Sequence, residues 1–290
     1  EKTGTTFLWS VISQHPKIYL TGFEKENHWW CRPRNSQNTD IIKNYIIDKY
    51  NHVVNVLSQQ KLPSELIFGD GSTSLFWEMI PRFNKNLPAT LRKTPSKRPY
   101  VIELVNSILP RAKYIVIFKE PVSRFISESG YFWHSLGTGN PTASKVHVFA
   151  KRAIYAFNQY LKETQIEHQN TTSFFFFRKV AAKGFYTLIK GIYSRHLLFW
   201  WKLMPIQNLL ILRSEDLLAN KNVVIQQVFD FLGVGRTRVL LKKDVKTNAR
   251  SKSQRFKPME VTLKMLNEFY QPFNQELAEI LQNEKFLWKK

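Results

Sequence analysis

Cysteine and acidic residues are both scarce in this sequence of 290 residues. Cys31 is the only cysteine, so the chain can form no intrachain disulfide and no cysteine-ligated zinc site. The 22 Asp and Glu residues face 43 Lys and Arg residues, which leaves a formal net charge of +21. A charge of this size predicts an anionic partner. Nucleic acid, an anionic membrane surface and a sulfated polysaccharide all satisfy it.

Long apolar runs and internal repeats are also missing. No stretch approaches the roughly 20 consecutive apolar residues that cross a bilayer. Hydrophobic residues still make up 43% of the chain, so we expect one domain over residues 1–290. The chain opens directly on a motif, and we expect the strand before it and any membrane anchor to lie upstream. Asn170 begins an Asn-Thr-Thr glycosylation sequon, which applies only in a secretory protein.

Short apolar runs alternate with long helical patterns along the chain. Strands separated by helices favour a parallel sheet with helices on both faces, so the predicted fold class is α/β. The predicted strands are Glu65–Phe68, Tyr114–Phe118 and Asn208–Leu212, and the predicted helices are Asp40–Leu57, Pro121–Trp133, Val146–Glu163, Tyr193–Lys202, Val223–Leu232 and Val261–Asn283, besides one that opens within residues 2–15. Basic loops are predicted at Asn84–Pro99 and Lys242–Lys257.

The first chemical motif is Lys2-Thr3-Gly4-Thr5-Thr6, where the chain enters the first predicted helix. The glycine permits close backbone approach, and amides and hydroxyls at a helix start can donate to a phosphate or sulfate. The spacing is not that of a Walker A loop, because the lysine comes before the glycine. An ordinary Ser/Thr-capped helix explains the pentapeptide equally well.

The second motif is Lys119 to Ser127, directly after the predicted strand Tyr114–Phe118. The strand delivers Lys119 to its carboxyl end, and Pro121 starts a helix on which Arg124 and Ser127 share one face. A second phosphate fits this place. A proline-started helix with a solvated arginine is the alternative interpretation.

Together the two motifs resemble the nucleotide-binding loops of the sulfotransferase superfamily. The first matches K-x-G-T-T-x-L, and the second matches R-[DN]-P-x-x-R-x-x-S except that Lys119 replaces the leading arginine and Glu120 the Asp or Asn. The resemblance implies a P-loop-like sheet and 3′-phosphoadenosine 5′-phosphosulfate (PAPS) as sulfuryl donor. It implies that the donor is held by Lys2, Thr3, Gly4, Thr5 and Thr6 at the 5′ side and by Lys119, Arg124 and Ser127 at the 3′-phosphate.

A third motif, Lys25-Glu26-Asn27-His28-Trp29-Trp30, resembles the K-E-x-H-[FW]-[FW] segment of Golgi polysaccharide sulfotransferases. By this resemblance Glu26 is the general base, Lys2 stabilises the leaving oxygen, and His28 orients the acceptor or Glu26. Lys25, Trp29 and Arg32 would contact the acceptor. A packed surface turn is the alternative for the Glu-His pair.

The likeness extends to the branch of this family that sulfates the 6-hydroxyl of N-acetylgalactosamine 4-sulfate in chondroitin or dermatan sulfate. Segments that carry it include GIYSRHLLFWW, LLILRSEDL and EKFLWKK. Asp70-Gly71-Ser72 stands where heparan sulfotransferases often carry E-K-[ST], which makes Ser72 a further candidate at the acceptor. By family analogy Tyr193 and Arg250 reach the nucleotide, although a buried tyrosine and a solvated basic loop explain them as well.

The resemblance also implies a Golgi-lumen enzyme with a type II anchor upstream of this chain, and an acidic polysaccharide rather than nucleic acid as partner. No metal is expected, because the sequence has no His, Asp and Glu cluster at ligand spacing. Three alternatives stay open from the residues alone. They are a heparan sulfate O-sulfotransferase, a P-loop kinase, for which the Walker lysine is missing, and a non-enzymatic polyanion-binding module, which explains the charge but not two phosphate loops.

Overall fold

The computed structural model describes residues 3–20, 25–26, 51, 58, 66–73, 75–77, 100–135, 142–164, 186–239 and 256–289. The predicted helix Asp40–Leu57 lies outside these residues except for Asn51. The loop Asn84–Pro99 and the sequon at Asn170 lie wholly outside them.

Strands in the described part of the chain form two parallel pairs. β1 pairs with β2, and β3 pairs with β4 in a register that sets Tyr114 opposite Leu209 and Phe118 opposite Arg213. Because the strands of a pair run the same way, the loops that follow β3 and β4 leave from one edge. The strands are β1 (Ile18–Leu20), β2 (Ile67–Gly69), β3 (Tyr114–Phe118) and β4 (Leu209–Arg213).

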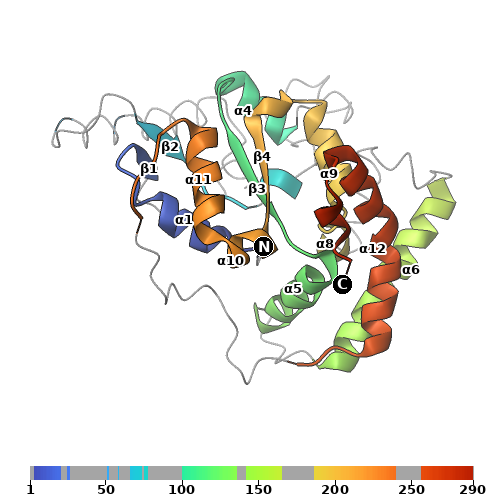
Figure 1. Ribbon diagram of the computed structural model, residues 1–290. Helices are drawn as coiled ribbons and strands as arrows, with labels where there is room; N and C mark the ends of the chain where they lie inside the picture. Colours follow the sequence, from blue (N-terminus) through green and yellow to red (C-terminus); the bar gives the residue numbers. More distant parts are fainter. Residues whose placement is uncertain are drawn as a thin grey trace.

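Helices cover both faces of the β3–β4 pair (Figure 1). Ile117 and Leu212 pack into an apolar cluster with the helices α1 and α11, whereas Phe118 and Ile211 pack with α9 and α12 on the other face. This two-sided burial explains why both strands read as continuous apolar runs. Each fully buried side chain of this size contributes about 1.5–3 kcal/mol. The observed arrangement confirms the predicted α/β class.

The described helices begin and end close to their predicted positions where a prediction existed. They are α1 (Thr5–Ile12), α4 (Val101–Ile108), α5 (Pro121–Ser135), α6 (Ala143–Thr164), α8 (Tyr186–Ile189), α9 (Tyr193–Trp201), α10 (Ser214–Ala219), α11 (Lys221–Leu232) and α12 (Glu260–Leu281), with 3-10 turns η1 (Leu75–Trp77), η4 (Ile206–Asn208) and η6 (Glu284–Leu287). Strand β1 and the short helices α4, α8 and α10 were not predicted.

The largest core cluster fills the space between α4, α5, α6, α8, α9 and α12. Its biggest fully buried members include Trp200, Tyr270, Phe125 and Phe157. Phe157 of α6 meets Phe273 of α12 edge to face at 6.2 Å between ring centroids. This core backs the loop after β3, because α5 begins in that loop and its buried face packs here.

Within the described ranges, no helix is long and apolar enough to cross a membrane. The same ranges hold no group of three His, Cys, Asp or Glu side chains placed to hold a metal ion.

Candidate functional site

The first predicted loop lies at the start of α1. Gly4 is the N-cap residue, and its φ of 98° is in the left-handed region that glycine adopts without strain. A Cβ on Gly4 would lie 3.1 Å from Cδ2 of Leu217, so the position is also tight. Because glycine has no side chain, the first amides of α1 have no side-chain acceptor at the N-cap residue. These amides and the half-buried Thr5 and Thr6 suit an oxyanion. Thr3 is buried beside them.

Lys25 and Glu26 lie beside this helix start. The Lys25 Nζ is 2.6 Å from Oε1 of Glu26 and donates to Oγ1 of Thr5 at 3.3 Å. The hydroxyl of Thr73 donates to Oε2 of the same carboxylate at 3.3 Å. The Glu26 side chain keeps 36% of its surface exposed, so solvent or a substrate can reach it. A carboxylate, an ammonium group and hydroxyls therefore meet at the N-terminus of α1.

The segment after β2 closes this corner. A Cβ on Gly71 would lie 2.7 Å from the carbonyl oxygen of Lys25 and 2.8 Å from Cε3 of Trp9, so a side chain there would force the segment away. The amide of Ser72 donates to Oδ1 of Asp70 at 2.6 Å and tightens the turn. The structure thus brings Ser72 to the corner that holds Glu26, and it adds Thr73, which sequence reasoning did not single out.

The second predicted loop joins β3 to α5. Glu120 caps the helix: its Oε1 accepts from the amide of Val122 at 2.8 Å and its Oε2 from the amide of Ser123 at 2.6 Å. The amide of Glu120 itself donates to Oε1 of Glu215 at 2.9 Å. The helix start is therefore occupied by a carboxylate of its own chain. An anion bound here has to rely on side chains such as Lys119 rather than on these amides.

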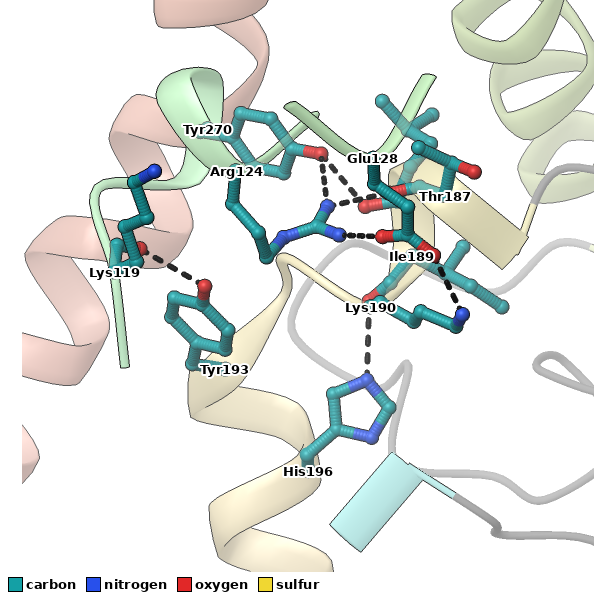
Figure 2. A network of polar contacts seen from close by, with 10 residues as sticks. Lys119, Arg124, Glu128, Thr187, Ile189, Lys190, Tyr193, His196 and Tyr270 are labelled. Carbon is teal, nitrogen blue, oxygen red and sulfur yellow. Dashed lines mark hydrogen bonds and ion pairs between the residues drawn. The ribbon is translucent and has the colours of Figure 1, made fainter. Parts of the chain in front are cut away.

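Arg124 belongs to a buried network and not to the loop surface (Figure 2). Its guanidinium forms an ion pair with Glu128 and donates to the carbonyl oxygen of Thr187, and it donates to Tyr270 Oη at 3.4 Å. Lys190 completes the network at 2.6 Å from Oε1 of Glu128. The Arg124 side chain is 3% exposed. The guanidinium therefore faces the core and is occupied there, and the role of Arg124 as a phosphate ligand stays a prediction.

Electrostatics keep this network charged. Burial alone would lower the pKa of Arg124, but Tyr270 and Glu128 outweigh it and raise that pKa. Burial alone would raise the pKa of Glu128, yet Arg124 and Lys190 hold it below its usual range. The pair is therefore ionised at neutral pH inside the core, where both charges need partners.

Tyr193 supports the second loop from below. Its hydroxyl donates to the carbonyl oxygen of Lys119 at 2.9 Å, and its ring stacks on Phe118 at 4.3 Å between centroids. Burial raises the pKa of Tyr193, so the hydroxyl keeps its proton for this bond. Tyr193 is therefore a buried tyrosine with a backbone contact, and its contact with the nucleotide stays a prediction.

Helix α10 connects the two loops. It follows β4 directly, and its Leu217 lies against Gly4 at the start of α1. Its Glu215 accepts the amide of Glu120 at the start of α5. Both loops therefore contact one short helix at the carboxyl edge of β3 and β4.

Several predicted site residues lie outside the described residues. They are Lys2, His28, Trp29, Arg32 and Arg250. Ser127 lies half-buried on α5, one turn after Arg124. The role of Glu215 was not predicted, although the run Ser214-Glu215-Asp216 directly after a predicted strand indicates a polar group at the sheet edge.

Comparison with solved structures identifies the fold. A crystal structure of a sulfotransferase from Alicyclobacillus acidocaldarius matches with a TM-score of 0.58 and 17% sequence identity, covering 97% of this chain and 92% of that chain. The fold is that of a sulfotransferase. The family model described as sulfotransferase domain matches residues 1–276, so the chain belongs to the sulfotransferase family. This confirms the family resemblance of the two loops.

Curated relatives refine the family. Carbohydrate sulfotransferase 15 of Homo sapiens is 27% identical over 316 residues, covering 99% of this chain and 53% of that protein. Its Mus musculus counterpart is 28% identical with the same coverage. The bifunctional heparan sulfate N-deacetylase/N-sulfotransferase 2 of Homo sapiens is 24% identical, covering 97% of this chain and 28% of that protein. The chain spans about half the length of the human and mouse carbohydrate sulfotransferases 15.

Proposed function

We propose that this chain catalyses transfer of a sulfuryl group from PAPS to a hydroxyl of a sulfated glycosaminoglycan. The observation that carries the proposal is the meeting of the Glu26 carboxylate, the Lys25 ammonium and the Thr5 hydroxyl at the N-terminus of α1. A base and an oxyanion cradle are thereby brought together from segments 20 positions apart in the sequence. Transfer of an anionic group between oxygens needs this pair of features.

In the proposed step Glu26 takes the proton of the acceptor hydroxyl while that oxygen attacks sulfur. The new bond is oxygen to sulfur, and the bond from sulfur to the bridging oxygen of the phosphosulfate breaks. The electron pair leaves with adenosine 3′,5′-bisphosphate. Lys25 forms an ion pair with the carboxylate before the step, and Thr73 donates a hydrogen bond to its second oxygen. Most of the rate gain would come from positioning and electrostatic stabilisation.

The donor substrate would be held by both loops. We assign the phosphosulfate to the amides of residues 4–6 and the hydroxyls of Thr5 and Thr6, with Lys2 on the leaving oxygen. We assign the 3′-phosphate to Lys119, which directly follows β3, and to Ser127 on α5. Both residues are half-buried. Arg250 of the basic loop 242–257 would close over the nucleotide.

The acceptor is proposed to be chondroitin or dermatan sulfate, at the 6-hydroxyl of N-acetylgalactosamine 4-sulfate. The net charge of +21 suits a polyanion, and binding should weaken with salt. Lys25, Arg32, His28 and Trp29 would contact the sugar chain. Gly71 supports assignment to the galactosamine branch, because heparan sulfotransferases often carry a lysine at this position. In this chain the glycine packs against Lys25.

We further propose that residues 1–290 form a single catalytic domain. It would work in the Golgi lumen, with an anchor outside this chain, and its sulfuryl transfer would need no metal ion.

Ligand-dependent thermal stability tests the proposal. Adenosine 3′,5′-bisphosphate without Mg²⁺ should raise the melting temperature, with about 2.7 kcal/mol of stabilisation at 100 times its Kd. Stabilisation by ATP only with Mg²⁺, or by polyanions alone, would contradict the proposal. Transfer of radiolabelled sulfate to a panel of chondroitin, dermatan and heparan chains then separates the acceptor assignments, and transfer to heparan alone would overturn the galactosamine assignment.

A further inference from the structure

The peptide unit that joins Lys119 to Glu120 is held at both of its polar atoms. Its carbonyl oxygen accepts from the Tyr193 hydroxyl at 2.9 Å, and its amide donates to Oε1 of Glu215 at 2.9 Å. A planar unit bonded at both ends cannot turn without breaking one bond. The direction in which the Lys119 side chain leaves the backbone is therefore set by α9 and α10, outside the loop.

The C-terminal segment holds Glu215 in turn. The indole Nε1 of Trp288 donates to Oε2 of Glu215 at 3.2 Å. The guanidinium of Arg213 lies 5.8 Å from the Trp288 ring centroid, and its Nε is 3.9 Å from the same Oε2. The Glu215 side chain is 34% exposed, so it would sample other rotamers without these contacts. The chain end and β4 thus determine where this carboxylate points.

Trp288 sits in a backbone conformation that needs support. Its φ of 46° and ψ of 36° fall in the left-handed region, which is unfavourable for a bulky side chain and persists only where the surroundings impose it. The supports are the bond to Glu215 and an aromatic cluster in which Phe286 meets both Trp288 and Phe118 edge to face. The family match ends at residue 276, so this segment lies beyond it.

We propose that Trp288 is a positioning residue for donor binding, acting through Glu215 on the Lys119–Glu120 peptide unit. The inference rests on the proposed function, because it takes Lys119 as a ligand of the 3′-phosphate. Trp288 itself contacts no substrate in this scheme. Its indole N–H keeps Glu215 in place, and Glu215 keeps the loop in the conformation that presents Lys119.

Trp288→Phe tests the relay because it keeps an aromatic ring and removes the N–H. Hydrogen exchange of the Glu120 amide in nucleotide-free protein should speed up about threefold to tenfold, the loss expected for one hydrogen bond. Trp201→Phe is the matched control, since the Trp201 indole N–H has no hydrogen-bond partner among the described residues. Unchanged exchange at Glu120 in Trp288→Phe, or an equal change in the control, would overturn the inference.

Donor kinetics supply the second readout. In Trp288→Phe the KM for PAPS should rise about threefold to tenfold, while kcat at saturating PAPS stays unchanged. A merely structural role would instead lower kcat through a smaller active fraction and leave KM unchanged, and that pattern would count against the proposal. Glu215→Gln should reproduce the KM effect, because its amide nitrogen cannot accept from the indole while its oxygen bonds Glu120.

The double variant Trp288→Phe/Glu215→Gln should have the same KM for PAPS as Glu215→Gln alone if the two residues act in series. Full additivity in the KM for PAPS would show that they act independently, and would contradict the relay. A wild-type chain that binds no adenosine 3′,5′-bisphosphate would sink the proposed function. The exchange measurement at Glu120 does not depend on nucleotide, so the two failures can be told apart.

Discussion

The loop at the start of α1 and the loop at the start of α5 are built in different ways. At α1 the N-cap is a bare glycine, and the charged groups Lys25 and Glu26 lie at the surface, with side chains 15% and 36% exposed. At α5 the N-cap is a carboxylate, and Arg124 and Glu128 beneath it are 3% and 6% exposed. The first loop leaves donors and a base accessible to a ligand. In the second loop, the first amides of the helix already donate to the Glu120 carboxylate.

This difference teaches a division of labour between two similar strand-to-helix turns. Reactive groups must gain and lose protons and contacts during turnover, which surface groups do at low cost. A loop that anchors one end of a ligand benefits from rigidity, which a buried network of ion pairs and hydrogen bonds provides. Substitutions at the first loop should therefore change turnover, and those beneath the second should change stability.

Glu26→Gln should give the largest effect, on turnover alone. Loss of a general base lowers kcat by about 10²–10⁴, while the Kd for adenosine 3′,5′-bisphosphate should not change. Sulfate transfer and nucleotide titration measure the two quantities, with Glu268→Gln on the exposed side of α12 as the control. Full activity in Glu26→Gln would remove this residue as the base and break the contrast between the loops.

Arg124→Met should lower the free energy of unfolding by about 3–5 kcal/mol, because it leaves Glu128 buried with one partner fewer. Urea unfolding measures this loss, and Lys145→Met on the exposed face of α6 is the control. Arg124→Lys should recover part of the stability by keeping the charge without the second donor group. A loss no larger than that of the control would show that the network does not brace the second loop.

Lys119→Ala should weaken binding of adenosine 3′,5′-bisphosphate about tenfold to 100-fold, the cost of losing a charged hydrogen bond. Lys119→Arg should bind at least as well as the wild type, because the guanidinium supplies two donors to a phosphate. Isothermal titration at low salt measures both. Equal affinity in all three proteins would place the 3′-phosphate elsewhere and leave the second loop without a ligand.

A pH effect of about 1.4 kcal/mol per unit should come from His196. Burial lowers the pKa of His196 to about 4, with Arg124 and Lys190 adding to it against a bond to the Ile189 carbonyl. Above the ordinary histidine pKa of about 6.5, the imidazole is neutral in both the folded and the unfolded chain, so it lowers the stability of neither relative to the other. Between that pH and about 4 only the unfolded chain gains the proton, and stability falls.

Urea unfolding across this pH range checks the effect, with His196→Gln as the variant that keeps a donor for Ile189. The difference in stability between the two proteins should shrink or reverse toward pH 4 in favour of the variant. Parallel curves for wild type and His196→Gln would show that the histidine is not protected in the core beside the network.

Local pattern was enough to predict the elements that carry a long apolar face. β3 matches its predicted bounds because five apolar residues stand between two lysines, and helices cover both faces of the strand. α12 runs from Glu260 to Leu281, close to the predicted Val261–Asn283. It continues through Pro272 because Leu266 and Tyr270 before this proline and Leu277 after it are buried in the core. β1 and α4 were missed because three and eight residues give too little periodicity.

The roles of site residues were less predictable because they depend on distant partners. Arg124 has the spacing of a phosphate ligand. Its guanidinium instead donates to Thr187 and Tyr270, which lie 63 and 146 positions away in the sequence. The hydroxyl of Tyr193 could equally have faced a ligand, and only the fold sets Lys119 above it. The motif at Gly4 to Thr6 was more informative, since the left-handed glycine and the helix start are local properties.

The Glu120 carboxylate that caps α5 affects the electrostatics of anion binding at this helix. It already neutralises the positive end of the α5 dipole, so that end offers little further attraction to an incoming anion. Whatever holds a phosphate beside it must be a mobile cation on a long arm, which can adjust to the ligand but is readily shielded by dissolved ions. As ionic strength rises, the contacts to the 3′-phosphate should therefore weaken before the contacts to the phosphosulfate.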